Sequence, residues 1–308
     1  MKEFKKYSKI YRIGHKEVEG VLDGRVLMFE KIDGGNFRFY FSENGDIIFG
    51  SRTQQLTSND GDDSNVAKSF KKIVDYVRDT ILENTDVEYR KDCSHLIFYG
   101  EACFKHTINY DWERIPLFLG FDIYDTQEDK YLGYFASKQI FEVGLDLYTV
   151  PYLGFYKGEE INDDLIPISK YALESSENKK AEGVVFKNYD KQIFAKYVSD
   201  DFKEKNSEAF GGNPKYNKVD DTNNAEFVFK YCTNSRIEKI IMRYLNNGED
   251  LDMKLMGKLI KETYEDIIEE EWYEILTSNW KLDFKSVRKL IAPRCRSVLE
   301  QMITNNSR

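Results

Sequence analysis

The 308-residue sequence has few of the residues that form zinc sites and disulfide frameworks. It contains three histidines, which argues against a zinc site built from histidine ligands. Its four cysteines form no C-x-x-C pair: Cys93, Cys103, Cys232 and Cys295. We therefore expect free thiols in a reducing cytoplasm and, where a metal is used, oxygen ligands.

Long apolar runs and prolines are also scarce. No stretch approaches the roughly 18 apolar residues that a membrane-spanning helix needs, and residues 1–11 lack the apolar core of a secretion signal. We expect a soluble, cytoplasmic protein without membrane contact. The five prolines argue against long disordered tracts, and 41% hydrophobic residues are enough to form buried cores.

Basic side chains are outnumbered over the whole chain, with 45 Lys and Arg against 54 Asp and Glu and a net charge of −9. This balance argues against a nucleic-acid coat protein and against a polybasic membrane binder. The charge is unevenly spread, because residues 213–308 hold 16 basic and 16 acidic side chains. The acidic excess therefore belongs to residues 1–212.

The hydrophobic pattern changes near residue 205. Before it, short aromatic and β-branched runs are bounded by Gly, Asn and Asp, which is typical of strands. The expected strands are 26–30, 37–41, 47–49, 96–99, 117–124, 184–186 and 193–197. Apolar residues at three- and four-residue spacing predict one helix between Val66 and Ile81. We expect an α+β fold for this part of the chain.

After residue 225 the apolar period is helical throughout. Asp283 can cap the last predicted helix, and Pro293 is expected to end or kink it. Turn-forming Gly, Asn, Pro and Asp residues separate the two parts of the chain. We therefore predict domains at 1–212 and 225–308, joined by a linker at 213–224.

One segment between two predicted strands suits nucleophilic phosphate chemistry: Glu30-Lys31-Ile32-Asp33-Gly34-Gly35-Asn36. Lys31 ends a strand and precedes two glycines, whose missing side chains let the backbone approach a phosphate closely. Its amine can act as a nucleophile once it has lost its proton.

Further short motifs follow in order along the N-terminal domain. They are Ser51-Arg52, Tyr99-Gly100-Glu101, Phe121-Asp122, Glu182-Gly183-Val184-Val185-Phe186-Lys187 and Ala195-Lys196-Tyr197-Val198. In this order and spacing the set resembles the covalent nucleotidyltransferase superfamily, which comprises ATP-dependent DNA and RNA ligases and mRNA capping enzymes. The resemblance covers all six of the superfamily's usual motifs over residues 26–198.

Within the superfamily the sequence looks most like the RNA-ligase-2 group. Asn36 stands where DNA ligases and capping enzymes typically have arginine, and a helical domain follows where those enzymes typically have a β-barrel. Residues 230–239 also look like the start of that group's C-terminal domain. The resemblance implies a nucleotidyltransferase domain built on antiparallel sheets with flanking helices, followed by an all-helical domain.

The sequence departs from the group in the last motif, where Val198 replaces the second of two lysines. Two interpretations are open: Lys187 supplies the missing charge, or one phosphate contact is absent. The role of Lys187 is itself open, because a lysine that follows an apolar strand is commonly just exposed to solvent.

The resemblance implies three phosphoryl-transfer steps. Lys31 attacks the α-phosphate of ATP to form lysyl-AMP, AMP passes to an RNA 5′-phosphate, and the RNA 3′-OH displaces AMP. Catalysis is expected from Lys31, Glu182 and Lys196, with Glu182 holding Mg²⁺ or Mn²⁺ through water. The residues expected to bind ATP or AMP are Glu30, Lys31, Asn36, Arg52, Glu101, Phe121, Glu182, Lys187 and Lys196.

Three of these residues have specific roles by resemblance. Phe121 should stack on adenine, Glu101 should bind the ribose hydroxyls, and Arg52 should contact phosphates. Each has a plainer alternative, because a lone phenylalanine is usually core and a lone charge is usually solvated.

Charge in the helical domain is segregated. Residues 262–274 contain seven acidic side chains and no basic one, whereas residues 281–308 contain seven basic and two acidic ones. Either the two stretches neutralise each other or the basic side chains face RNA. The candidate RNA contacts are Arg236, Lys285, Arg288 and Lys289, followed by Arg294 and Arg296. A structural role for Arg236 at a helix start is equally open.

We predict an enzyme that seals 3′-OH and 5′-phosphate RNA ends at nicks in duplex RNA, with RNA as its partner and no protein partner evident. One alternative is a DNA ligase or a capping-type guanylyltransferase of the same superfamily. Another is a non-catalytic nucleotide- or RNA-binding relative. In the helical domain, Tyr264, Trp272 and Trp280 are expected to belong to the core rather than to bind RNA.

Overall fold

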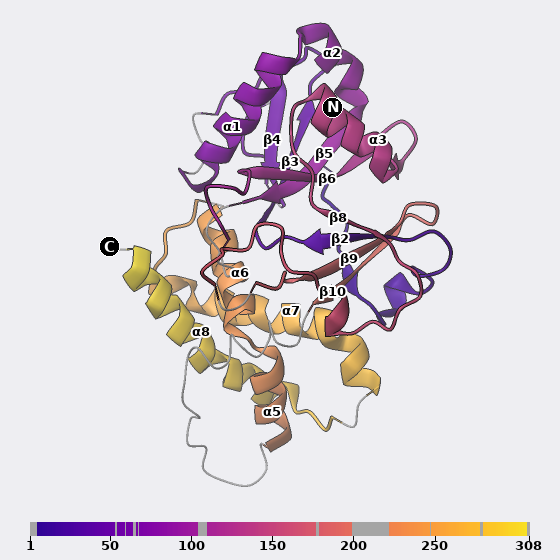
Figure 1. Cartoon of the computed structure of the whole chain (residues 1–308). Coiled ribbons are helices and arrows are strands. Elements are labelled where there is room, and N and C mark those ends of the chain that lie inside the picture. Colours follow the sequence, from indigo (N-terminus) through magenta and orange to yellow (C-terminus); the bar gives the residue numbers. More distant parts are fainter. Residues whose placement is uncertain are drawn as a thin grey trace. The chain divides into compact units, whose positions relative to one another are not determined.

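The computed structural model describes the chain as two compact units (Figure 1). Of the described residues, one unit contains 5–13 and 17–198, and the other contains 14–16 and those from 222 onwards. The residues described are 5–52, 54–58, 60–63, 66, 68–103, 110–176, 179–198, 222–246, 248–277 and 280–306.

The first unit is built on two five-stranded sheets, which confirms the predicted α+β class with antiparallel sheets. In one sheet the order is β1 (Tyr11–Arg12), β10 (Ile193–Val198), β9 (Gly183–Asn188), β2 (Leu27–Lys31) and β8 (Tyr152–Phe155). Only the pair β1–β10 in this sheet is parallel. The other sheet is antiparallel, in the order β4 (Ile47–Ser51), β3 (Gly35–Phe41), β5 (Leu96–Ala102), β6 (Phe118–Asp125) and β7 (Lys130–Tyr131).

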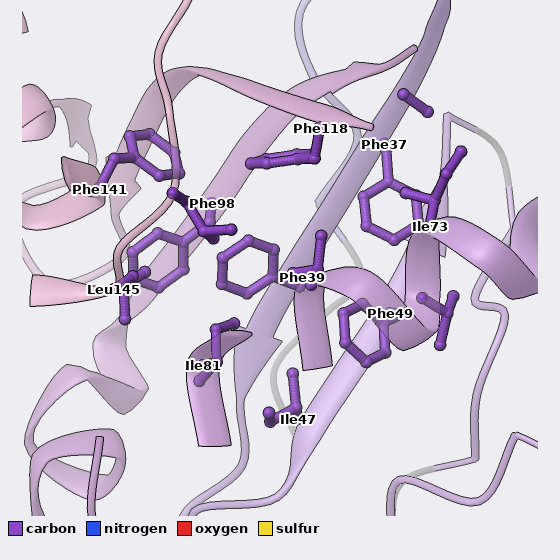
Figure 2. Close-up of a cluster of buried hydrophobic side chains, with 14 of the residues drawn as sticks. Phe37, Phe39, Ile47, Phe49, Ile73, Ile81, Phe98, Phe118, Phe141 and Leu145 are labelled. Carbon is purple, nitrogen blue, oxygen red and sulfur yellow. The ribbon is translucent and has the colours of Figure 1, made fainter. Parts of the chain in front are cut away.

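Helix α1 (Lys68–Asn84) covers one face of the second sheet (Figure 1). Its predicted stripe is confirmed, because Phe70, Ile73, Val77 and Ile81 are fully buried. They pack on an aromatic layer that β3, β4, β5 and β6 supply (Figure 2). Alternate residues of a strand share one face, so the aromatic positions of these strands gather there. Short helices complete the unit: α2 (Val87–Asp92) and α3 (Tyr134–Gln139), the latter running into a π-turn at Ile140–Gly144.

The second unit is helical, as predicted. Its α-helices within the described residues are α5 (Thr222–Tyr231), α6 (Asn234–Asn246), α7 (Met256–Thr277) and α8 (Phe284–Asn306). The apolar stripes of α6, α7 and α8 meet in one core. Most of the predicted linker lies outside the described residues, and residues 222–224 belong to α5. The domain limits 1–212 and 225–308 therefore stay predictions.

Three local predictions for the helical unit can be compared with the structure. Asp283 caps α8, because its carboxylate accepts hydrogen bonds from the backbone N–H groups of Lys285 and Ser286. Pro293 does not end α8, which continues to Asn306. Trp280 packs on the core, but the prediction for Trp272 is wrong, because its side chain is 40% exposed. No helix in the described parts of the chain is long and apolar enough to cross a membrane.

Candidate active site

Strand pairing brings Lys31 and Glu182 together. Lys31 ends β2 opposite Gly183, the first residue of β9, so Glu182 lies immediately beside the lysine. The Lys31 Nζ is 2.6 Å from Glu182 Oε2, and the two side chains are 22% and 4% exposed. The predicted nucleophile and the predicted metal-binding carboxylate are therefore direct partners, although 151 residues separate them.

Gly183 is required by the close approach of a third strand. A Cβ at this position would overlap the carbonyl oxygen of Tyr197 and lie 2.9 Å from the Cα of Val198. Val198 pairs with Gly183, and Lys196 pairs with Val185. Paired residues of neighbouring strands project on the same face of a sheet. The side chains of Lys31, Lys196 and Val198 consequently share one face.

Glu30 belongs to the opposite face, because it is adjacent to Lys31 in the same strand. Its buried carboxylate accepts hydrogen bonds from the Ser169 hydroxyl and from the Lys170 backbone N–H. Burial raises the pKa of this carboxyl, and these two hydrogen bonds oppose the rise. The Glu30 side chain therefore binds residues 169–170 and does not point toward the predicted nucleotide site.

Asn36 and Glu101 face each other across β3 and β5. Gly34 allows this approach, since a Cβ there would lie 2.5 Å from the Ala102 carbonyl oxygen and 2.9 Å from Glu101 Cγ. The buried Oδ1 of Asn36 has no hydrogen-bond partner among the described residues. An unsatisfied buried amide is costly, so this oxygen is suited to a ligand or to ordered water.

Arg52 lies in the turn that follows β4. Ser51, the last residue of β4, pairs with Phe37 and donates its backbone N–H to the Gln54 carbonyl oxygen, so the chain turns at Arg52 and does not continue the strand register. Its side chain is exposed, as a group that contacts phosphates of an incoming nucleotide must be. Strand pairing thus aligns Asn36 with Glu101, and Arg52 follows the end of β4, which neighbours β3 in the sheet.

Phe121 sits at a bulge in β6. Tyr99 pairs with Asp122 and Gly100 pairs with Gly120, which leaves Phe121 as the extra residue. Bulges redirect a side chain and are common beside functional sites. Phe121 is partly buried and packs against the same cluster as Val185 of β9. Val185, which the sequence did not single out, shares its sheet face with Lys31.

Lys187 lies in the interior behind this bulge. Its side chain is 2% exposed, and its Nζ donates to the Phe121 carbonyl oxygen (2.7 Å) and to Asp122 Oδ2 (2.8 Å). Burial lowers the pKa of this lysine, and the Asp122 charge opposes that effect. In this arrangement Lys187 does not supply the charge that is missing at Val198.

Tyr110 is a buried residue of the site that sequence reasoning missed. Its hydroxyl accepts a hydrogen bond from the Asp33 backbone N–H at 2.9 Å. Burial, followed by the Asp33 carboxylate, raises the pKa of Tyr110 well above its usual value. Its hydroxyl thereby holds the turn after Lys31. No local motif indicates this tyrosine, because it lies 77 residues from Asp33 in the sequence.

The carboxylates of this site do not form a preassembled metal cage. Within the described parts of the chain, no group of three or more His, Cys, Asp or Glu side chains could hold a metal. Mg²⁺ and Mn²⁺ accept oxygen ligands, and Mg²⁺ usually keeps several waters and binds through one or two carboxylates plus phosphates. Glu182 fits such a sparse site, with ligands completed by water and phosphate.

The candidate RNA contacts fall into two groups. Lys285, Arg288 and Lys289 are exposed on the first turns of α8. Arg236 is instead internal, where its guanidinium donates to Asp266 (3.1 Å) and Glu271 (2.6 Å) of α7. Arg294 donates to the Cys232 carbonyl oxygen at the end of α5. The structure therefore favours the structural alternative for Arg236.

A sequence model of the RNA ligase family matches residues 24–198, which is more than half of the chain. The chain therefore belongs to the RNA ligase family. The match contains all of the site residues described above in the first unit. No curated protein sequence gives a significant match.

Similar solved structures include several of a Naegleria gruberi RNA ligase. A variant with ATP and manganese is 21% identical, with 64% of this chain and 57% of that chain covered and a TM-score of 0.46. A variant with AMP and manganese is 20% identical over 67% and 59% of the chains, with a TM-score of 0.49. The ligase with pyrophosphate is 21% identical over 68% and 60%, with a TM-score of 0.48. The chain thus spans about three fifths of these proteins or slightly less.

Proposed function

We propose that this protein is an ATP-dependent RNA ligase that joins 3′-OH and 5′-phosphate ends at nicks in duplex RNA. The observation that carries the proposal is the direct pairing of Lys31 with Glu182 on the sheet face that also presents Lys196. A reactive amine, an acidic metal ligand and a second cation are the groups that nucleotidyl transfer requires.

In the first step Lys31 Nζ forms a bond to the α-phosphorus of ATP. The bond from that phosphorus to the bridging oxygen breaks, pyrophosphate leaves with the electron pair, and the amine proton passes to solvent. Lys196 and Arg52 stabilise the charge on the phosphates. A divalent metal bound at Glu182 would neutralise further phosphate charge. AMP then passes to the RNA 5′-phosphate, and the RNA 3′-OH displaces it.

In this proposal the base and the sugar of ATP contact residues of β5, β6 and β9. Phe121 and Val185 provide partly buried apolar surfaces for adenine. Glu101 accepts hydrogen bonds from ribose hydroxyls, and the Asn36 amide contacts the phosphate or the RNA end. Of the solved Naegleria gruberi RNA ligase variants, one contains ATP and manganese and another contains AMP and manganese.

Covalent labelling with α-labelled ATP and Mg²⁺ or Mn²⁺ tests the first step. The wild-type chain should become labelled, Lys31→Ala should not, and Lys130→Ala should behave as wild type because Lys130 is an exposed lysine paired with Glu128. Labelling that survives Lys31→Ala would refute the nucleophile. Labelling with GTP in place of ATP would favour a guanylyltransferase.

Sealing of matched nicks in RNA, DNA and mixed duplexes tests the substrate. Sealing of RNA nicks well above all-DNA nicks supports the proposal, and equal rates would favour a DNA ligase. Val198 favours one second candidate, a non-catalytic nucleotide binder, because the last motif has lost a lysine. ATP binding without release of pyrophosphate would decide for that candidate.

A further inference from the structure

Asp122 lies at the centre of a buried polar cluster in the first unit. The residue is 0% exposed. Its carboxylate accepts hydrogen bonds from three other side chains. Lys187 Nζ and the Tyr7 hydroxyl both donate to Oδ2, and the Tyr189 hydroxyl donates to Oδ1 at 2.7 Å. Lys187 belongs to β9, and Tyr189 follows the end of β9 directly. Tyr7 belongs to the N-terminal segment, by which we mean residues 5–8.

A buried ion pair is stable only when its remaining hydrogen-bonding capacity is filled. Lys187 supplies the charge that balances Asp122, and the two tyrosine hydroxyls donate two further hydrogen bonds to the carboxylate. Burial raises the pKa of Tyr7 and of Tyr189 well above the usual value, so both hydroxyls keep the protons that they donate.

This cluster is connected directly to the bulge that carries Phe121. Lys187 Nζ donates to the Phe121 carbonyl oxygen as well as to Asp122, which is the next residue in the chain. The Tyr7 ring packs edge-on against the Phe121 ring, with centroids 4.8 Å apart. Tyr7 therefore contacts the bulge through its ring and supports it through its hydroxyl.

The rest of the N-terminal segment is fastened to the second sheet. The Lys5 carbonyl oxygen accepts hydrogen bonds from Arg38 Nη1 (2.7 Å) and the Tyr99 hydroxyl (3.0 Å). Ser8 donates its backbone N–H to the Tyr131 hydroxyl at 3.4 Å. Tyr7 is thus held on both sides and lies outside every motif of the nucleotide site.

We infer that Tyr7 is a positioning residue for nucleotide binding. Its hydroxyl completes the Asp122–Lys187 pair, and this pair fixes the bulge so that the Phe121 ring is held ready to stack on the base of ATP. The inference rests on the proposed function, because it assigns Phe121 to the base.

The test compares three variants that each remove one hydroxyl. Tyr7→Phe and Tyr189→Phe each remove a hydrogen-bond donor to Asp122, whereas Tyr131→Phe removes a hydroxyl that is hydrogen-bonded to Ser8 of the same segment. In single-turnover lysine adenylylation we measure the half-saturating ATP concentration (written KM) and the maximal rate (written kcat). We also measure the Kd for ATP by calorimetry without metal and the thermal unfolding of each full-length variant.

Tyr7→Phe and Tyr189→Phe should raise KM and Kd for ATP by about tenfold, with a much smaller change in kcat, whereas Tyr131→Phe should leave KM unchanged. In a Phe121→Leu background, Tyr7→Phe should add no further rise, since the ring that it positions is gone. An equal KM in Tyr7→Phe and Tyr131→Phe, or additive effects with Phe121→Leu, would overturn the inference.

The same experiment separates this inference from the proposed function. A wild-type chain that is never labelled would refute the ligase proposal, while the Kd values for ATP would still decide whether Tyr7 acts through Phe121. A different result would be that all three variants lose the same thermal stability while the Kd for ATP stays unchanged. That result would show that Tyr7 only stabilises the fold, and it would overturn the inference.

Discussion

The amine of Lys31 lies 2.6 Å from Oε2 of Glu182. The carboxylate is almost fully buried, while the lysine keeps partial access to solvent. The carboxylate therefore holds the amine in place at the end of β2. Under the proposed function Glu182 would hold a divalent metal, and a carboxylate engaged in this way would hold the lysine amine less tightly.

We expect Glu182→Gln to reduce lysine adenylylation by about a hundredfold or more, because the amide keeps the shape but loses the charge that a divalent metal needs. The rate of labelling from ATP measures this effect. Glu88→Gln is the matched control, since Glu88 is 77% exposed and pairs only with Lys91 in α2. A normal rate in Glu182→Gln would show that the carboxylate is not needed for the chemistry.

Gly183→Ala should destabilise the first unit by about 1–3 kcal/mol, because the new Cβ would collide with the backbone of β10 at Tyr197. It should also slow adenylylation, since β10 carries Lys196. Gly133→Ala is the control: no heavy atom lies within 4 Å of its Cβ position. Thermal unfolding and labelling measured together should separate the two variants, and equal stability would contradict the packing argument.

Several features of the fold could be predicted from sequence because they depend on local pattern. The stripe from Phe70 to Ile81 predicted α1, and the alternating aromatics of 37–41 predicted β3. Motif order identified Lys31 and Glu182 as members of one site. Their contact follows once β2 and β9 pair, which no local pattern reports.

Other features could not be predicted, because they depend on which face a side chain takes and on partners far away in the chain. Glu30 and Lys187 lie in motifs, yet one belongs to the opposite face and the other is buried against Asp122. Tyr7 reaches Asp122 across 115 residues. Trp272 was expected in the core because aromatic residues usually pack there, but its position on α7 leaves it exposed.

Arg236→Met should destabilise the helical unit by about 3–5 kcal/mol, because it removes a guanidinium that pairs with the buried Glu271 carboxylate. Arg296→Gln is the control and should cost less than about 0.5 kcal/mol, since its pair with Glu300 is exposed. Denaturation followed by tryptophan fluorescence measures both. If Arg236→Met were stable and instead weakened RNA binding, Arg236 would be an RNA contact after all.

Neutralising Lys285, Arg288 and Lys289 together should weaken RNA binding without unfolding α8, because their side chains are exposed and Asp283 still caps the helix. If each side chain contacts a phosphate, the slope of log affinity against log salt should fall by about 0.7–0.9 per residue. Lys261→Gln, an exposed lysine beside Glu265 on α7, should leave the slope unchanged. Titrating labelled nicked RNA at several salt concentrations measures the slope. An unaltered slope in the triple variant would mean that these basic side chains do not contact RNA phosphates. It would favour the other interpretation of the charge pattern, in which they neutralise the acidic side chains of α7.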